Sequence, residues 1–485
     1  MPFQATFLFT TLIISLHSLC SATENMPIIK GGRPNIVLFL ADDQSYFDHA
    51  INGNQAVPTP VTEAFSKEAL VFDRAYTGQA ICAPSRSILY SGLYPIRNGC
   101  FINHTSVRPG VQTIAHYLKT LDYDVILAGK SHVNPRDQFP WTEHMEPVRQ
   151  SGMPRPAIPL EEMDRYIAQN KGKPFCMIVA SEYPHGPYIR ETPFSTQDIQ
   201  LAPYLPGTVS NLNRATQYYA SIRQKEREFA TVLELIDEHG IRENTLVVYA
   251  DDHGADMGKF TVSERGLRVA FMARWPGKVA SGRTDALTSF VDFVPTAVEL
   301  AGGTPPADLD GKSLIPVLTG RASKNHDYVY GVSHNQGIQR RSVFPQRSIS
   351  DGQYRYIFSF NSIDRLERDR AAGKAINYFV ERGAKEHNAK EEQLYDINAD
   401  PYELKDLSGD PKYAHVKGRL RSQLFAWMKS QNDHLRENGP ITLFAVKRGK
   451  LNVPAPQFNY QVPEKHRSPL GAALEDAHAI TAQNK

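Results

Sequence analysis

The chain has 485 residues, of which 41% are hydrophobic and 22% charged, and its formal net charge at pH 7 is +2. These proportions are those of an ordinary globular protein, and the length suffices for one large domain and a smaller one. A net charge this small argues against binding of a polyanion through the overall field, so any anionic substrate must be held by local positive charge. We therefore expect no nucleic-acid partner.

The N-terminus has the pattern of a secretory signal peptide. An apolar stretch from Phe7 to Leu16 is too short to span a bilayer comfortably, and small residues at Cys20-Ser21-Ala22 offer a cleavage site. We expect residues 1–22 to be removed and the protein to be exported, either to a periplasm or to the medium. No other long apolar run follows, so the sequence predicts no stable membrane insertion.

Three cysteines remain after cleavage at Ala22, namely Cys82, Cys100 and Cys176. An odd number in an exported protein leaves at least one of them unpaired. Sequence alone does not decide whether Cys100 and Cys176 form a disulfide. A lipid anchor on Cys20 is the alternative to simple cleavage.

Four continuous apolar runs predict strands that are buried on both faces of a sheet. They lie at residues 35–40, 124–128, 175–180 and 245–250. Helical patterns, such as the one at 217–239, lie between them, and this alternation predicts an α/β fold with a mainly parallel sheet. Ionisable residues follow each run directly, at the end of the strands where open α/β sheets bind ligands.

The pattern changes at about residue 325. Short aromatic-rich strands are predicted at 328–333, 353–360 and 393–397, and a helix is predicted at 413–431. A few strands in sequence followed by a helix are typical of an antiparallel sheet with a packed helix.

These patterns divide the chain into parts. We predict a catalytic α/β domain at 30–325, with a large, mostly parallel mixed sheet flanked by helices. A smaller α+β subdomain with an antiparallel sheet is predicted at 326–455, and a tail rich in Pro, Gln and Ala at 456–485.

The stretch from residue 81 to residue 92 carries the most specific chemical signal. Pro84 suits the first position of a helix, where its missing N–H costs nothing, and Gly92 suits the helix end. Cys82 would then lie at a helix N-terminus, where free N–H groups favour an anion. Arg86, one turn further on, adds a fork of positive donors. A buried core residue or half of a disulfide is the alternative for Cys82 taken alone.

Two acidic pairs follow predicted strands. Asp42 and Asp43 end the first strand, and Asp252 with His253 ends the fourth. Carboxylate-bearing loops that meet at one crevice form a site for a hard cation such as calcium or magnesium. A nucleophile bound to such a cation stays deprotonated at neutral pH. Acid pairs in loops also occur without any metal.

The order and spacing of these motifs resemble the type I sulfatases of the alkaline phosphatase superfamily. The resemblance rests on Cys82-x-Pro84-Ser85-Arg86, on the two acidic pairs, and on Trp275-Pro276-Gly277 and Gly311-Lys312-Ser313-Leu314. In that family the cysteine is oxidised after translation to formylglycine, whose hydrated gem-diol is the nucleophile. The resemblance therefore implies a sulfuric ester hydrolase that a formylglycine-generating or anaerobic sulfatase-maturating enzyme must activate.

The resemblance implies one calcium ion and its ligands. They are Asp42, Asp43, Asp252, His253 and Cys82 as formylglycine. Many family members have asparagine in place of His253, and a histidine nitrogen is a less typical ligand of calcium.

The resemblance also implies the roles of five further residues, Arg86, Lys130, His132, His185 and Lys259. Lys130 and Lys259 clamp the sulfate, and Arg86 orients the gem-diol. His132 takes the proton from the second hydroxyl of the sulfated gem-diol, so that sulfate leaves. His185 protonates the leaving alcohol or binds a sulfate oxygen.

A finer resemblance is to the N-sulfoglucosamine sulfohydrolase (sulfamidase) branch and its bacterial polysaccharide-sulfatase relatives. It is carried by the segments at 129–133, 330–334, 344–348 and 394–401. It implies that His334 and Arg347 reach the substrate from the second domain, although packing between domains explains both residues equally well.

We expect exo-acting hydrolysis of a sulfate ester on an oligosaccharide from a sulfated polysaccharide. Sulfamate hydrolysis on N-sulfoglucosamine is one alternative, and a phosphonate or phosphate monoester hydrolase is another. A sulfated-glycan-binding protein without turnover would result if Cys82 were never converted. The asparagine in Asn103-His104-Thr105 is a glycosylation acceptor only in a eukaryotic secretory pathway.

Overall fold

The computed structural model describes residues 32–57, 59–255, 258–335, 343–376, 378–387, 390–437, 439, 445–447 and 450–452. The predicted signal peptide at 1–22 and the predicted tail at 456–485 lie outside these residues. The described residues from Arg33 onward belong to one compact unit, so the predicted boundary near residue 325 is a division within that unit.

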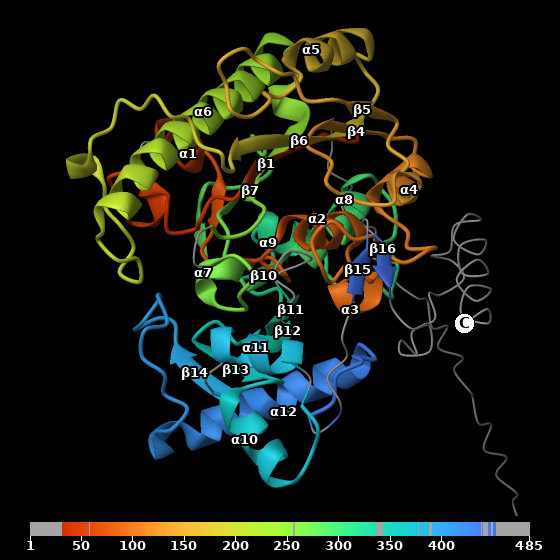
Figure 1. Cartoon of the computed structure of the whole chain (residues 1–485). Coiled ribbons are helices and arrows are strands. Elements are labelled where there is room, and N and C mark those ends of the chain that lie inside the picture. The colour runs from red at the N-terminus through yellow and green to blue at the C-terminus, as the bar shows by residue number, and fades with distance from the viewer. Residues whose placement is uncertain are drawn as a thin grey trace, which may run out of the picture. The chain divides into compact units, whose positions relative to one another are not determined.

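An eight-stranded sheet forms the centre of the N-terminal part (Figure 1), in the order β5-β4-β6-β1-β7-β8-β2-β9. Among these strands β8 runs antiparallel to both of its neighbours, and the other pairings are parallel. The large, mostly parallel mixed sheet predicted from the sequence is therefore confirmed. The strands are β1 (Asn35–Asp42), β2 (Leu70–Phe72), β4 (Asp124–Gly129), β5 (Glu143–Met145), β6 (Phe175–Pro184), β7 (Thr245–Asp251), β8 (Phe271–Arg274) and β9 (Gly282–Thr284).

Helices cover both faces of this sheet, because the central strands are apolar on both sides. Figure 1 shows α1, α5 and α6 on one face and α2, α4, α8 and α9 on the other. The helices of this part are α1 (Pro60–Ser66), α2 (Cys82–Ser91), α3 (Pro95–Asn98), α4 (Ile114–Lys119), α5 (Leu160–Gln169), α6 (Val209–Glu238), α7 (Glu264–Leu267), α8 (Phe293–Leu300) and α9 (Ile315–Leu318). A short parallel pair, β3 (Ala75–Tyr76) with β10 (Thr288–Ser289), lies outside the large sheet.

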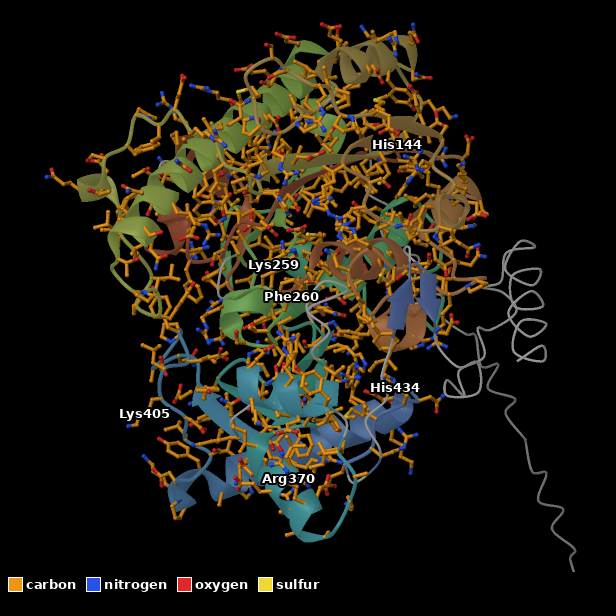
Figure 2. All side chains as sticks on the ribbon, in the orientation of Figure 1. His144, Lys259, Phe260, Arg370, Lys405 and His434 are labelled. Atoms are coloured by element: carbon orange, nitrogen blue, oxygen red, sulfur yellow. The ribbon has the colours of Figure 1, made fainter. Side chains whose placement is uncertain are left out.

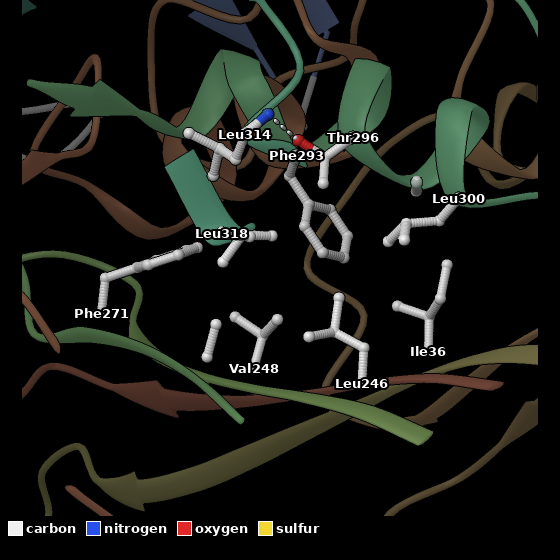
Figure 3. A pocket seen from close by; sticks show the side chains of 11 residues that line it. Ile36, Leu246, Val248, Phe271, Phe293, Thr296, Leu300, Leu314 and Leu318 are labelled. Atoms are coloured by element: carbon white, nitrogen blue, oxygen red, sulfur yellow. Dashed lines mark hydrogen bonds between the residues drawn. The ribbon is translucent and has the colours of Figure 1, made fainter. Parts of the chain in front are cut away.

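The two faces of β1 enter different cores. Val37 and Phe39 join the cluster that α6 covers, which includes Phe229. Ile36 points to the opposite side, toward α8 and α9, as Figure 3 shows. There the enclosed cavity is only about 10 Å³, and hydrocarbon side chains line it except for Thr296, so it is a packing gap and no ligand site.

The C-terminal part is built on an antiparallel sheet in the order β11-β12-β13-β14. This confirms the predicted α+β arrangement. Its elements are β11 (Val329–Asn335), β12 (Val343–Ser350), β13 (Tyr354–Ser359), α10 (Ile363–Ala371), α11 (Tyr378–His387), β14 (Glu392–Asp396) and α12 (Ala414–Ser430), and the pair β15 (Ala445–Lys447) and β16 (Lys450–Asn452) follows. The sequence did not predict β12, where Pro345 and four polar residues interrupt any apolar pattern, yet every residue of this strand is buried.

A buried ion cluster joins the two parts. The guanidinium of Arg355 on β13 donates to Oε1 of Glu264 on α7, with its Nε at 3.0 Å. Its Nε also lies 3.5 Å from Oε1 of Glu403. All three side chains are almost fully buried, and Arg355 is the partner that the two acids share, while Arg268 lies 3.4 Å from the other oxygen of Glu264.

We therefore expect Arg355→Met to lower the free energy of unfolding by about 3–5 kcal/mol, because it leaves buried carboxyl groups without their partner. The matched control is Lys390→Met, which removes a mostly exposed lysine 2.8 Å from Asp406 and should cost less than about 1 kcal/mol. Urea unfolding of both variants makes the measurement. Equal losses would show that the buried cluster does not stabilise the fold.

A second buried carboxyl group ties α6 to the sheet. Oε2 of Glu228 accepts a hydrogen bond of 2.6 Å from Ser181 Oγ on β6, and Oε1 accepts one from the Ile158 N–H at 3.3 Å. Burial raises the pKa of Glu228 to about 7. The folded protein therefore holds this proton to a higher pH than the unfolded chain does.

Stability should consequently fall as pH rises. Between the ordinary glutamate pKa and about 7 the folded state binds more protons at Glu228 than the unfolded state, so the free energy of unfolding decreases through that interval and levels off above it. Glu228→Gln should remove this slope and leave the variant roughly 3 kcal/mol more stable relative to wild type at pH 8 than at pH 5. Thermal unfolding across that range would show parallel curves if the interpretation is wrong.

Candidate active site

The predicted nucleophile lies at the start of a buried helix. Helix α2 begins at Cys82 itself, two residues earlier than predicted, and all ten of its residues are buried. Pro84 occupies the third position, where its N–H would also lack an intrahelical partner. Gly92 ends the helix with a φ of 69°, as predicted, and its N–H donates to Ile88 O.

Two strand ends bring three carboxylates next to Cys82. Asp42 is the last residue of β1 and Asp43 follows it, and Asp252 follows the neighbouring strand β7. The Asp43 N–H donates to Asp252 Oδ1 at 3.0 Å, and Cys82 Sγ lies 3.9 Å from Asp43 Oδ1. Asp42 and Asp252 are fully buried, and Asp43 is 8% exposed.

Three cations balance these carboxylates. Arg86 donates to Asp42 Oδ1 at 3.2 Å and to Asp252 Oδ2 at 3.1 Å. Lys130, just after β4, bonds the other oxygen of Asp42. Lys259 donates to both oxygens of Asp43, at 2.9 and 2.6 Å. Figure 2 labels Lys259 and the adjacent Phe260 close to α7.

Burial and neighbouring charge shift the titration of these groups in opposite directions. Burial raises the pKa of Asp252 to about 7. For Asp42 burial acts in the same direction, but the positive charge of Lys130 outweighs it and the pKa is lowered. Burial also disfavours the Cys82 thiolate, yet Lys130 and Lys259 hold the pKa of that thiol well below its usual range.

His253 completes the group around the cysteine. Its Nε2 lies 3.3 Å from Cys82 Sγ and 3.2 Å from Asp43 Oδ1. Burial opposes its protonation, but Asp252 and the other nearby negative charges raise the pKa of His253 to about 9. The next residue must be glycine, because a Cβ on Gly254 would lie 1.8 Å from the carbonyl oxygen of Arg265.

The residues present fit a hard cation. Asp43, Cys82 and His253 offer ligand atoms within 4.8 Å of one another, and so do Asp42, Cys82 and Asp252. Carboxylate oxygens dominate this donor set, as calcium prefers, and an oxygen at position 82 in place of sulfur would add to it. The ammonium groups of Lys130 and Lys259 form ion pairs with Asp42 and Asp43, so these carboxylates already attract positive charge.

His185 lies at the mouth of the site. It follows β6, and its Nε2 lies 3.4 Å from Asp43 Oδ2. Burial lowers its basicity, but the negative charges of Cys82 and Asp42 outweigh burial and raise its pKa. Arg155, which the sequence analysis did not single out, places its NH2 group 2.5 Å from His185 Nδ1, and the Gly186 carbonyl oxygen lies 2.5 Å from the same nitrogen. His185 therefore presents Nε2 toward the carboxylate centre.

His132 has a histidine partner that the sequence analysis missed. Its Nε2 lies 2.8 Å from Nδ1 of His104, whose Nε2 lies 3.3 Å from Asn103 Nδ2. Asn103 Oδ1 in turn accepts a hydrogen bond from the Ala83 N–H at 3.1 Å. The Asn103-His104 pair thus connects the N-terminus of α2 to His132. Only its position so soon after the Cys82 motif could have drawn attention to it.

The direction of this hydrogen-bond chain follows from its first donor. The backbone N–H of Ala83 can only donate, so Asn103 turns its oxygen to it and its NH2 to His104. His104 then carries its proton on Nδ1 and donates to His132 Nε2. Neutral His132 accordingly carries its proton on Nδ1, a buried atom without a hydrogen-bond partner among the described residues.

Several of these residues hold a left-handed backbone. Asp43, His104, His132 and Phe260 all have φ between 50° and 71° without being glycine. Such conformations cost free energy, and their concentration around Cys82 is typical of a functional site.

Comparison with known proteins agrees with this geometry. A protein-family model described as Sulfatase matches residues 34–303, and a second, described as N-sulphoglucosamine sulphohydrolase, C-terminal, matches residues 253–370. The first match alone covers more than half of the chain. The chain belongs to the sulfatase family. It is accordingly a sulfuric ester hydrolase that acts on sulfated carbohydrates.

Individual sulfatases are also similar to this chain in sequence or in fold. An ulvan-active sulfatase of Formosa agariphila is 42% identical, over 90% of this chain and 89% of its own. The human N-sulphoglucosamine sulphohydrolase is 24% identical, over 82% of this chain and 90% of its own. BT4656, solved in complex with its substrate D-glucosamine-2-N,6-O-disulfate, has the same fold, with a TM-score of 0.65 and 18% identity over 84% of this chain and 100% of its own.

The two residues expected to bind substrate from the C-terminal part lie in the interior of this sulfatase. Arg347 on β12 is fully buried and pairs with Asp433, with its Nε at 2.7 Å. His334 on β11 is also fully buried, and its ring lies 5.4 Å from that of His434. These positions favour the packing explanation that the sequence left open.

The described cysteines are unpaired. Cys82, Cys100 and Cys176 are all buried free thiols, so Cys100 and Cys176 form no disulfide. Burial raises the pKa of Cys100 to about 11 and that of Cys176 to about 12, which sets both apart from Cys82. None of the described helices has the length and apolar character of a membrane-spanning segment.

The histidine pair gives a kinetic prediction. His104→Ala removes the hydrogen bond that orients the His132 ring, and kcat should fall about ten- to a hundredfold with little change in KM. Steady-state kinetics on an aryl sulfate test this. An unchanged kcat would contradict the role.

Asn103→Asp serves as the companion variant. It keeps an acceptor for the Ala83 N–H but offers His104 a second acceptor, so both histidines should exchange the nitrogen that carries the proton. Nitrogen NMR of histidine-labelled protein reads the tautomers directly.

Proposed function

We propose that this sulfatase hydrolyses a sulfate ester on a sugar of an oligosaccharide released from a sulfated polysaccharide, with Cys82 as the precursor of its nucleophile. The observation that carries the proposal is the meeting of Cys82 with three buried or nearly buried carboxylates at the ends of β1 and β7 and with three cations, Arg86, Lys130 and Lys259.

Formylglycine made from Cys82 would supply the attacking oxygen, and a calcium ion held by Asp42, Asp43, Asp252 and His253 would supply fixed positive charge. Arg86 lies between Asp42 and Asp252 and orients both side chains.

Lys130 and Lys259 lie beside the same group of carboxylates, Lys130 paired with Asp42 and Lys259 with Asp43. Sulfate carries negative charge on its peripheral oxygens, and that charge must be balanced as the ester bond breaks. We assign the two ammonium groups to the sulfate oxygens. Their positive charges also act on the sulfur of Cys82, because they hold the pKa of that thiol below its usual range.

His185 is placed to serve the leaving group. Together with Asp43 and Lys259 it lines an open pocket, and the volume of this pocket is about 580 Å³. This size lies within the roughly 300–1,000 Å³ of small-molecule sites. A protonated His185 can donate to the departing sugar oxygen, and its raised pKa favours the protonated form.

We propose exo action on an O-sulfate of a terminal sugar, and the ulvan-active relative supports a sulfated polysaccharide as the source of that sugar. The C-terminal match to N-sulphoglucosamine sulphohydrolase favours sulfamate as the second candidate substrate. We also propose export, with residues 1–22 as the signal peptide, and maturation by a formylglycine-generating or anaerobic sulfatase-maturating enzyme. The alternative function, hydrolysis of a phosphonate or phosphate monoester, is tested by comparing the rates on sulfate and phosphate esters.

The first test is the mass of the peptide that contains Cys82, from protein produced with and without a maturating enzyme. We expect the mass difference for replacement of the CH2–SH group by an aldehyde, and release of sulfate from ulvan oligosaccharides in proportion to the converted fraction. Cys82→Ala should abolish turnover, whereas Cys100→Ala, at a cysteine remote from the carboxylates, should retain it. Full sulfate release by unconverted protein would refute the nucleophile.

The same preparation separates the alternatives. A sulfatase hydrolyses aryl sulfate much faster than aryl phosphate, and a phosphomonoesterase shows the reverse order. Release of sulfate from N-sulfoglucosamine in preference to O-sulfated sugars would show that the substrate is a sulfamate and not a sulfate ester. Binding of sulfated oligosaccharides without release would leave only a binding protein.

A further inference from the structure

Three donor atoms of the active site suit a metal other than calcium as long as Cys82 is still a thiol. Cys82 Sγ lies 3.3 Å from His253 Nε2 and 3.9 Å from Asp43 Oδ1. His253 Nε2 lies 3.2 Å from the same oxygen of Asp43. Sulfur and imidazole nitrogen are ligands that zinc prefers, whereas calcium takes oxygen ligands.

The separations of these three atoms fit a zinc ion. Donor atoms on a tetrahedral zinc ion, with bonds of about 2.0–2.3 Å, lie about 3.3–3.6 Å from one another. Each of the three measured separations agrees with this range to within about 0.4 Å. A thiolate and a carboxylate also supply two negative charges, which balance the charge of a divalent cation. Zinc can therefore bind all three donors with only small movements of their side chains.

His253 is held with the required nitrogen toward the other two donors. Its Nδ1 lies 3.0 Å from the carbonyl oxygen of Gly254, which can only accept a hydrogen bond. Nδ1 therefore carries a proton, and Nε2 faces Cys82 and Asp43. A hydrogen bond from the second ring nitrogen to a carbonyl oxygen is a common support of a metal-bound histidine. The ring is fully buried, so the surrounding structure keeps this orientation.

Asp43 is both oriented and reachable from solvent. The Lys259 ammonium donates to its Oδ2 at 2.6 Å and to its Oδ1 at 2.9 Å, and the shorter bond can remain when Oδ1 binds an ion. Asp43 also lines the open pocket, which gives an ion a path to the site. A fourth ligand position suits Asp252 Oδ1, which lies 3.7 Å from His253 Nε2, or a water molecule.

We propose that the unconverted protein binds one Zn²⁺ ion through Cys82 Sγ, His253 Nε2 and Asp43 Oδ1. The proton of the thiol, and any proton on His253 Nε2, pass to the solvent when the ion binds. Conversion of Cys82 removes the sulfur and leaves a set of ligands rich in oxygen, which suits calcium. The inference goes beyond the proposed function, because it concerns the chain before conversion. Zinc bound in this way covers the sulfur that conversion must oxidise.

Cobalt titration of the unconverted protein tests the inference. Co²⁺ takes the same ligands as zinc, and a thiolate ligand gives it a sulfur-to-cobalt charge-transfer band in the near ultraviolet. We expect this band to saturate at one cobalt ion per chain and to disappear when Zn²⁺ displaces the cobalt. Calorimetry should show that zinc binds at least about a hundredfold more tightly than calcium. Zinc should also raise the Tm of the unconverted protein.

Three variants locate the site. Cys82→Ser should lose the charge-transfer band, and His253→Asn, which keeps the sulfur, should weaken zinc binding about tenfold or more. The control is Cys100→Ser, at a buried free thiol that lies 3.6 Å from Thr105 Oγ1, and it should keep both the band and the affinity. Circular dichroism verifies that each variant is folded.

Three results would overturn the inference: no band with wild type, a band that persists in Cys82→Ser, or equal affinities for zinc and calcium. The test also separates this inference from the proposed function. Zinc binding by the thiol form, with no sulfate release after conversion, would support the zinc site and refute the hydrolysis. Sulfate release by converted protein, with no band from the thiol form, would do the reverse.

Discussion

The structure depends on holding three carboxylates close together in the interior. Asp42, Asp43 and Asp252 repel one another, and burial makes that repulsion stronger because few water molecules screen it. Arg86 and the two lysines compensate the charge, and the parallel pairing of β1 with β7 fixes the separation of the strand ends. Every other feature of the site, including the position of α2, is arranged around this balance.

Much of this arrangement follows from local sequence. Apolar runs followed by acids or histidine identify the central strands and their ligand-binding ends, because the period of a buried strand leaves a clear pattern. The start of α2 was predicted two residues late, since proline is tolerated throughout the first turn and not only at its first position. β12 was missed for a different reason. Its polar side chains are satisfied by partners distant in sequence, such as Asp433 for Arg347.

The same limit applies to the site. Family motifs point to the residues that contact the reacting group, but the partners that orient them leave no such mark. His104 and Arg155 are ordinary residues until the fold brings them to His132 and His185.

The length of α6 has a consequence for how such enzymes diverge. Its 30 residues extend about 45 Å. Glu228 anchors its middle to the sheet, whereas Arg214 and Gln217 near its start line the pocket. The turns that line the pocket are therefore separate from the turn that holds the helix to the sheet. Relatives of this sulfatase can thus keep the same catalytic carboxylates and still differ in the pocket wall, through substitutions in the first turns of this one helix.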